Sequence, residues 1–309
     1  MSAQVIDTSF LPSARALRRG KLGNGVMWSS ALGLLTVGGG TFLFICLFLV
    51  IEAYPALVSG RGLLAFFFTD PWAPLAEPPT FGIIHSWLST LLITGLCLCL
   101  AVPVGFGIGL FLSEVAHPWV QITLRPAMDP LAGIPSVVYG FFGYVTLLPW
   151  LEARFDMATG ESILAAALIL SIMVLPFVAS TSAEAFRAVP QELRESALAQ
   201  GVTRAHMIRR VVVVWATPGM FAAAALGLAR AIGETLAVLM LAGNSVAVPG
   251  SLLDRGQPLT ALITTELGEA GVNSDKYHAL FAAGLTLMAV IVLINTLIWT
   301  WKKRVLNHG

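Results

Sequence analysis

The chain has 309 residues, of which 57% are hydrophobic and 11% are charged, and its mean hydropathy is +0.82. Soluble domains are about 45–50% apolar and about 25% charged, so this composition excludes an ordinary soluble domain and predicts an integral membrane protein. The net charge of +1 does not separate one function class from another, whereas the positions of the charges along the chain do.

Residues 1–29 are expected to form a cytoplasmic tail. Basic side chains in this tail are suited to contact with anionic lipid, which makes membrane lipid the first expected partner; they are Arg15, Arg18, Arg19 and Lys21. The first apolar segment is longer than the 7–15-residue core of a signal peptide, so it is expected to remain in the protein. This segment and the Pro- and Gly-rich loop after it make up residues 30–85. They are predicted to be an addition to a core at 86–301.

Six apolar segments are long enough to cross the hydrocarbon layer of a bilayer, which takes about 20 residues. They are residues 30–51, 87–112, 131–149, 163–182, 216–242 and 279–301. The predicted fold class is therefore an all-α integral membrane protein with six transmembrane helices. An even number of crossings places both termini on one side of the membrane.

Lys and Arg beside the membrane spans determine which side is cytoplasmic. One side of the six-helix arrangement holds most of these residues, namely Arg15, Arg18, Arg19, Lys21, Arg125, Arg187, Arg194, Arg204, Arg209, Arg210, Lys302, Lys303 and Arg304. The other side holds Arg61, Arg154, Arg255 and Lys276. The asymmetry predicts that both termini are cytoplasmic, with residues 302–309 as a short C-terminal tail.

Small residues and prolines are frequent in the predicted core. Gly105, Gly107 and Gly109 are expected to give a small-residue face for close helix packing. Prolines at 103, 135 and 176 interrupt successive spans, which is tolerated where neighbours or a cavity satisfy the freed carbonyls. Each proline alone is explained by a packing kink, but three in succession favour a moving or pore-lining bundle.

The longest predicted cytoplasmic loop, 184–211, has the pattern of two helices joined at a glycine. Pro190 suits the first position of a helix over 191–200, and Gly201 can end that helix in a left-handed conformation. Thr203 is expected to cap a second, basic helix. Such an elbow, with a face of small residues, suits docking into a partner's groove. The alternative is an ordinary loop on the lipid surface, which explains neither the paired caps nor the small face.

Arg230 and Glu234 lie in the otherwise apolar segment 216–242. A charged side chain at the membrane centre costs about 2.5–3.5 kcal/mol, so the two together cost on the order of 5–7 kcal/mol before any pairing. Their i,i+4 spacing predicts that they share one helix face and neutralise each other. One interpretation is a structural pair that locks two helices together. The other is an anion pathway in which Arg230 provides the positive charge and Glu234 its counter-charge.

Motifs for catalysis are absent from the sequence. The chain contains no P-loop, no HExxH pattern and no GxSxG elbow. No catalytic residue, metal or cofactor is therefore expected, and the chain is not predicted to be an enzyme. If it moves a solute uphill, the energy must come from a partner or an ion gradient.

The segment Glu195-Ser196-Ala197-Leu198-Ala199-Gln200-Gly201 resembles the EAA loop of ABC importer permeases. Ser196 stands where the family has the first alanine of that motif, and Val214 stands where it has a proline after the loop. The resemblance implies that Glu195, Ser196, Ala197 and Gly201 belong to a helix that docks into an ATPase subunit.

Other segments narrow the resemblance to phosphate importer permeases of the PstC type. Gly-Ile-Pro-Ser-Val-Val-Tyr-Gly at 133–140 is similar to their Pro-Ser-x-x-x-Gly element, and residues 229–235, around Arg230, are similar to their charged fifth core helix. Further similar segments are 242–245, 259–260, 266–270 and 278–281. The resemblance extends from about residue 81 to the C-terminus.

This resemblance implies the type I ABC importer permease fold and a place in the bacterial inner membrane. It also implies four kinds of protein partner: a second, PstA-type permease, two ATP-binding subunits of the PstB type and a periplasmic phosphate-binding protein of the PstS type. The chain would form half of the pathway for inorganic phosphate. Alternatives are a permease for another oxyanion (tungstate, molybdate or sulfate) and a secondary transporter or channel, which would leave the elbow unexplained.

Overall fold

The structure is a computed structural model that describes residues 14–58, 62–69 and 71–306. Within these ranges, nothing is described of the side chains at 14–26, 125, 127, 129, 132, 298, 299 and 301–306. The predicted lipid contact of the basic N-terminal tail, and the cationic side chains of the C-terminal tail, therefore lie outside the described part. By its internal contacts the chain divides into two compact units, residues 1–51 and 52–309.

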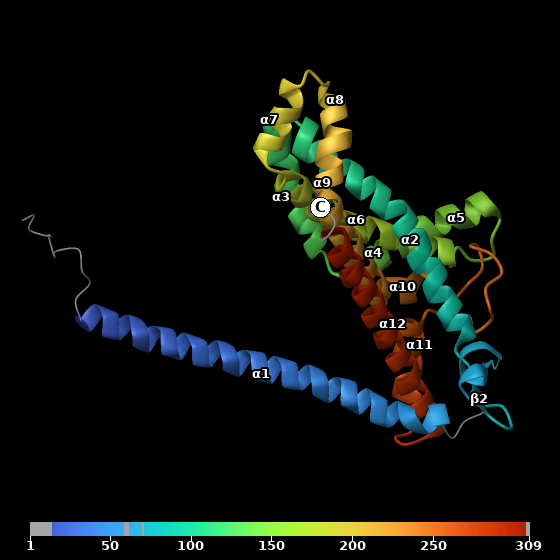
Figure 1. The fold of residues 1–309 in the computed structure, drawn as a ribbon. Helices are drawn as coiled ribbons and strands as arrows, with labels where there is room; N and C mark the ends of the chain where they lie inside the picture. Colours follow the sequence, from blue (N-terminus) through green and yellow to red (C-terminus); the bar gives the residue numbers. More distant parts are fainter. Residues whose placement is uncertain (1–13, 59–61, 70, 307–309) are drawn as a thin grey trace, which may run out of the picture. The chain divides into compact units, whose positions relative to one another are not determined.

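Helices dominate both units (Figure 1). In chain order the elements are α1 (Ala14–Val58), η2 (Ala65–Thr69), β1 (Trp72–Ala73), β2 (Thr80–Phe81), α2 (Ile84–Leu110), η3 (Phe111–Val115), α3 (Pro118–Gly133), α4 (Ser136–Phe142), η4 (Gly143–Leu147), α5 (Leu148–Phe155), α6 (Ile163–Arg187), α7 (Gln191–Ala199), α8 (Arg204–Met207), η5 (Ile208–Val212), α9 (Val213–Gly233), α10 (Leu236–Leu241), α11 (Leu259–Glu266), η6 (Leu267–Glu269) and α12 (Asp275–Leu306). The two short strands pair antiparallel, Trp72 opposite Phe81.

The first unit consists of α1 as far as residue 51. Large apolar side chains such as Leu34, Leu35 and Phe42 are exposed along this helix. An exposed surface of this kind is costly in water but favourable in contact with lipid. The helix therefore has the surface of a membrane-spanning segment, although it begins well before the predicted start at residue 30.

Five helices in the described part of the chain are long and apolar enough to cross a membrane: Met27–Val58, Ile84–Val115, Ile163–Arg187, Arg204–Gly233 and Asp275–Leu297. The predicted span at 131–149 is not among them, so a sixth crossing stays a prediction. Its predicted boundaries are wrong because α3 ends at Gly133 and a new helix starts only at Ser136. Pro135 disfavours helical geometry in the residue before it, and Ile134 is indeed extended.

Close packing of α2 on α6 forms the centre of the second unit. A Cβ added to Gly105 or Gly109 would lie within 3.0 Å of atoms of Val178 or Ser182, so α6 approaches where α2 has no side chain. The Ser182 hydroxyl also donates to the Gly105 carbonyl at 3.3 Å. Gly107 has no neighbouring atom within 4 Å. The predicted small-residue face is thus confirmed for Gly105 and Gly109 and is wrong for Gly107.

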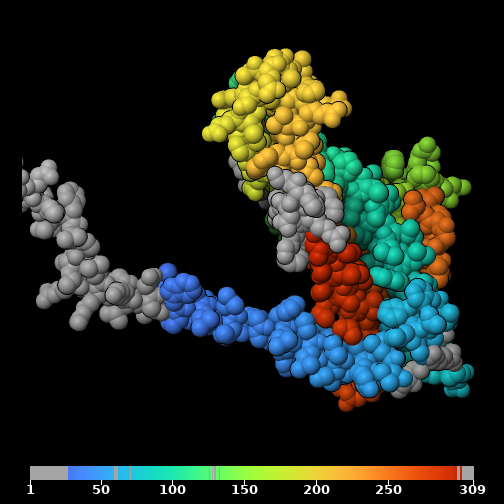
Figure 2. Space-filling view, in the orientation of Figure 1, coloured from blue at the N-terminus to red at the C-terminus, as the bar shows by residue number. Residues whose placement is uncertain are grey.

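The two ends of this unit differ in character. At one end, η2, the strands and α11 pack around the start of α12, where Lys276 pairs with Glu266 at 2.6 Å and His278 Nδ1 lies 2.9 Å from the Glu52 carbonyl oxygen. At the other end, α7 and α8 form the elbow (Figure 1). In Figure 2 the elbow, coloured yellow to gold, projects beyond the neighbouring helices. The fold therefore separates the site of the predicted docking elbow from the loops around α11.

Candidate functional site: a broken helix and a capped elbow

The apolar segment predicted to be one helix at 216–242 is broken near its middle. Helix α9 ends at Gly233, Glu234 is extended, and α10 starts at Leu236. The expectation that Arg230 and Glu234 share one helix face is therefore wrong. Gly233 is a poor helix former, which explains why the helix can end at this position even though its surroundings are apolar.

Arg230, in the last turn of α9, is held by an aromatic ring instead of a carboxylate. Its guanidinium carbon lies 3.9 Å from the centre of the Phe177 ring on α6, within the range of a cation–π contact. The charge also interacts electrostatically with Tyr139 on α4. The buried Nε of Arg230 has no hydrogen-bond partner in the structure. The cation is thus oriented while part of its hydrogen-bonding capacity stays unused.

Glu234 is bonded to backbone on the other side of the break. Its carboxylate accepts a hydrogen bond from the Ala237 N–H at 3.2 Å, at the start of α10. Arg230 and Glu234, both in the described part of the chain, do not form an ion pair with each other. A cation near a helix C-terminus and an anion near a helix N-terminus both complement the helix dipole. The break therefore separates the two charges and stabilises each of them locally.

Backbone carbonyls on both sides of the break accept hydrogen bonds from threonine hydroxyls. The Glu234 carbonyl accepts from the Thr260 hydroxyl of α11 at 2.9 Å. The Gly233 carbonyl accepts from the Thr235 hydroxyl at 3.4 Å, and Gly233 itself is exposed on the surface of the chain. In a membrane, irregular backbone is tolerated where it is buried in protein or lines a water-filled cavity. The break has the properties of a wall of such a cavity, or of an interface with another chain.

The elbow has the predicted local structure. Helix α7 ends at Ala199, Gly201 is left-handed with φ +77°, and the Thr203 hydroxyl accepts from the His206 N–H at 3.3 Å. Pro190 lies one position earlier than predicted, at the N-cap. The helix–glycine–helix geometry at 191–207 is therefore confirmed.

Residues proposed for docking lie on different sides of α7. Ser196 and Glu195 are exposed, and the Glu195 carboxylate accepts a hydrogen bond from the Gln191 side chain at 3.2 Å. Ala197 instead packs against an apolar cluster beneath the elbow that includes Phe186 and Met207. Of the small residues, Ser196 and Ala199 are thus available to a partner, whereas Ala197 holds the helix in place.

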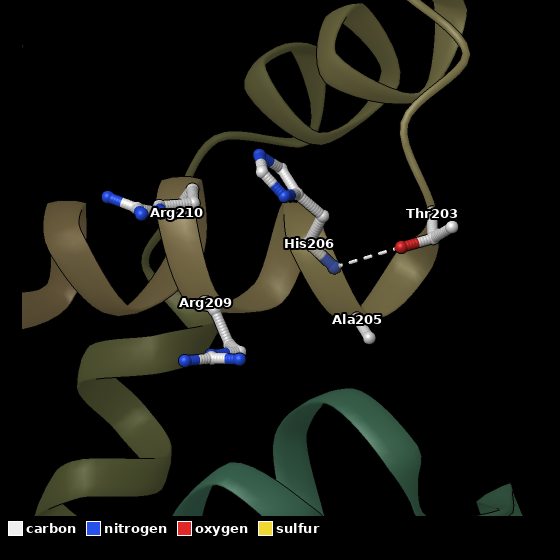
Figure 3. A pocket seen from close by; sticks show the side chains of 5 residues that line it. All are labelled: Thr203, Ala205, His206, Arg209 and Arg210. Carbon is white, nitrogen blue, oxygen red and sulfur yellow. Dashed lines mark hydrogen bonds between the residues drawn. The ribbon is translucent and has the colours of Figure 1, made fainter.

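Basic side chains lie along α8 and η5. Thr203, Ala205, His206, Arg209 and Arg210 line a pocket of about 290 Å³ (Figure 3). The side chains of His206 and Arg209 leave the helix in different directions, so the cationic groups do not converge on one point (Figure 3). The arrangement gives the elbow a basic surface and no built anion site.

Two of the contacts that were not predicted from the sequence involve charged residues of the break and of the elbow. One is the ring of Phe177 beneath Arg230. The other is an ion pair between Arg194 of α7 and Glu114 of η3 at 2.7 Å, with the Glu114 side chain 6% exposed. Phe177 is one apolar residue among many in its span, and Glu114 lies 80 residues before Arg194, so neither pairing has a local sequence signal.

Comparison with known proteins gives a consistent result. Residues 105–305 match the family described as "Binding-protein-dependent transport system inner membrane component". The probable ABC transporter permease protein YqgH of Bacillus subtilis is 37% identical over 242 residues, 78% of each chain. The phosphate transport system permease protein PstC of Haemophilus influenzae is 34% identical over 265 residues, 80% of this chain and 82% of that protein. PstC 2 of Mycobacterium tuberculosis is 34% identical over 275 residues, 82% and 83% of the two chains.

Solved structures share the fold at lower identity. A chain of the MetNI methionine ABC transporter in an inward-facing conformation superimposes with a TM-score of 0.56 at 20% identity, covering 75% of this chain and 99% of that one. A chain of a bacterial alginate ABC transporter in complex with its periplasmic protein superimposes with a TM-score of 0.62 at 15% identity, covering 94% and 97%. These likenesses establish the fold alone.

Proposed function

The chain belongs to the family of binding-protein-dependent inner-membrane components of ABC importers, and from this premise we propose that it is the permease subunit of an ATP-driven phosphate importer. As a member of that family it is a multi-pass inner-membrane protein of a bacterial importer, is not itself an enzyme, and works with ATPase subunits and a periplasmic binding protein. The particular partners proposed are a PstA-type permease, two PstB-type ATPases and a PstS-type phosphate-binding protein.

Relatives named as phosphate permeases support the choice of phosphate. Several proteins with that name are 30–34% identical over most of their length. A phosphate anion cannot cross hydrocarbon unaided, so its path needs cationic or hydrogen-bond-donating groups. Arginine offers a planar fork of donors that fits phosphate oxygens, and Arg230 lies in an otherwise apolar helix. The observation that carries the proposal is this cation, oriented by Phe177 and free of any carboxylate partner among the described residues.

The break after Gly233 suggests how phosphate would be released. Conduction requires binding that is weak enough to let the ion leave. In the proposed pathway, Arg230 attracts the anion, and Glu234, held on the far side of the break by the Ala237 N–H, repels it onward. Discontinuous helices line the substrate sites of many transporters, which is consistent with this role.

The elbow is proposed to connect the pathway to ATP hydrolysis. With both termini cytoplasmic, α7 and α8 face the cytoplasm, where Glu195 and Ser196 are exposed for an ATPase subunit. Gly201 follows α7 in a left-handed conformation that other residues rarely adopt, and this conformation lets the chain turn sharply from α7 to α8. Ala197 keeps α7 seated on the cluster beneath it.

Phosphate uptake by complexes that carry Arg230→Gln or Glu234→Gln tests the proposal. The complex is assembled with its partners in proteoliposomes, and radiolabelled phosphate is the substrate. A hydrogen bond to a charged group contributes about 1.5–3 kcal/mol, so Arg230→Gln is expected to lower uptake by roughly tenfold to a hundredfold. Glu234→Gln is expected to slow uptake by slowing release. Arg154→Gln, at an exposed arginine in the last turn of α5, is the matched control.

Competition identifies the substrate in the same assay. An excess of unlabelled phosphate is expected to abolish uptake, whereas sulfate, molybdate and tungstate are expected to leave it unchanged. Absence of phosphate uptake, with ATP-dependent uptake of one of those anions by the same complex, would reassign the substrate. Normal uptake by both Arg230→Gln and Glu234→Gln would show that the two residues have a purely structural role.

A further inference from the structure

An ion pair at the inner corner of the elbow joins segments that are far apart in the sequence. Arg194 of α7 donates to the Glu114 carboxylate at 2.7 Å and to the Phe186 carbonyl, at the end of α6, at 2.8 Å. It also donates to the carbonyl of Val189. One guanidinium thus contacts η3, which continues α2, the end of α6 and the turn that leads into α7. The fork geometry of arginine permits several such bonds at once.

A second arginine forms a hydrogen bond with the backbone of Glu114. The Arg204 side chain of α8 donates to the Glu114 carbonyl oxygen. Both helices of the elbow are therefore bonded to the same residue. The side chains of Glu114 and Arg194 are 6% and 14% exposed, so solvent screens their interaction little.

Apolar packing attaches the elbow to α6 and α9 more than to α2. The cluster beneath the elbow includes Phe186, Val212 and Ala216, and α2 contributes Leu110 at its edge. Beside the ion pair, a cavity of about 410 Å³ is lined by Glu114, Arg194 and Arg204 among others. On this side the connection of the elbow to α2 therefore depends on the bonds to Glu114.

We propose that Glu114 is a positioning residue that ties the docking elbow to α2, so that a movement of the elbow on its ATPase partner is passed to the transmembrane helices. This inference rests on the proposed function of the elbow. Helix α2 is closely packed on α6 at Gly105 and Gly109, so the elbow, α2 and α6 move as one body. Without the Glu114 bonds, part of the movement is absorbed in the elbow.

Glu114→Gln tests this with little change in shape. The amide keeps the size and an acceptor but removes the charge, and Arg194 retains two carbonyl partners. In the assembled complex, phosphate uptake and ATP hydrolysis are measured together. Uptake per ATP is expected to fall roughly 2- to 30-fold, the range that mutations in coupling networks produce, while hydrolysis and ATPase co-purification persist. Glu114→Asp is expected to restore the ratio, and Asp156→Asn, an exposed carboxylate outside the elbow, to leave it unchanged.

A double variant tests whether Glu114 and Arg194 act through their ion pair or independently. If the two act through each other, Glu114→Gln with Arg194→Gln lowers uptake per ATP no further than the worse single variant. An unchanged ratio in Glu114→Gln would overturn the inference. So would a parallel fall of uptake, hydrolysis and assembly, because that pattern belongs to a residue that only supports folding.

A second readout does not depend on the substrate. Spin labels at the exposed positions Ala199 and Gly107, in a background without native cysteines, report the distance between α7 and α2. Glu114→Gln is expected to broaden the distance distribution, and an unchanged distribution would contradict the proposed tie. Should the wild-type complex not import phosphate, the proposed function fails while this measurement still decides the role of Glu114.

Discussion

At the scale of the residue, Arg230 shows where inference from the sequence succeeded and where it could not. A cation in an apolar span was recognisable from composition alone. Its pairing with Glu234 was expected from their spacing, but that spacing implies contact only in a continuous helix, and the helix ends at Gly233. The partner found, Phe177, is 53 positions away and resembles any other apolar residue of its span.

Replacing Phe177 tests whether the ring orients the cation. A cation–π contact contributes about 0.5 kcal/mol when exposed and about 2 kcal/mol or more when desolvated, so Phe177→Leu is expected to lower phosphate uptake by roughly 2- to 30-fold. Phe177→Tyr keeps an aromatic face and is expected to retain uptake. Radiolabelled phosphate uptake by the reconstituted complex gives both values. Equal uptake by the leucine and tyrosine variants would show that the ring has no such role.

At the scale of the element, local signals predicted the elbow well and the span boundaries poorly. The caps at Gly201 and Thr203 act within a few residues, so the sequence contains all the information that fixes them. Span ends depend on which neighbours satisfy the backbone. Of the three prolines expected to interrupt their spans, Pro135 coincides with a break, whereas α2 and α6 continue through Pro103 and Pro176. The break after Gly233 was not predicted.

The contact of α2 with α6 leads to a prediction with a control on the same helix. Gly109→Ala would place a methyl carbon 2.9 Å from the Ala183 backbone nitrogen, so the helices must move apart. Overpacking of this kind costs about 1–3 kcal/mol. Gly107→Ala meets no atom within 4 Å and is expected to be neutral or to stabilise by up to about 1 kcal/mol.

Thermal unfolding of the purified complex compares the two alanine variants. The midpoint is expected to fall for Gly109→Ala and to stay level or rise for Gly107→Ala. An equal decrease in both would mean that α2 and α6 are not packed through the face that contains Gly105 and Gly109.

At the scale of the whole molecule, the class of protein could be deduced from composition and charge, and the family from short motifs. The comparisons confirm the permease family, and the five candidate spans confirm a helical membrane protein. The sixth crossing, the orientation and the identity of the partners remain predictions. Apolar side chains such as Phe141 and Phe142 on α4 are exposed in the single chain, and the sequence does not distinguish lipid from a partner subunit as the surface that covers them.

Reconstitution with and without the partner subunits tests the central claim most directly. Proteoliposomes are prepared with this chain alone and with the full set of a second permease, ATPases and the phosphate-binding protein. The expected result is that only the full set concentrates phosphate and that it does so only with ATP. Accumulation of phosphate by the chain alone, without nucleotide, would contradict the account.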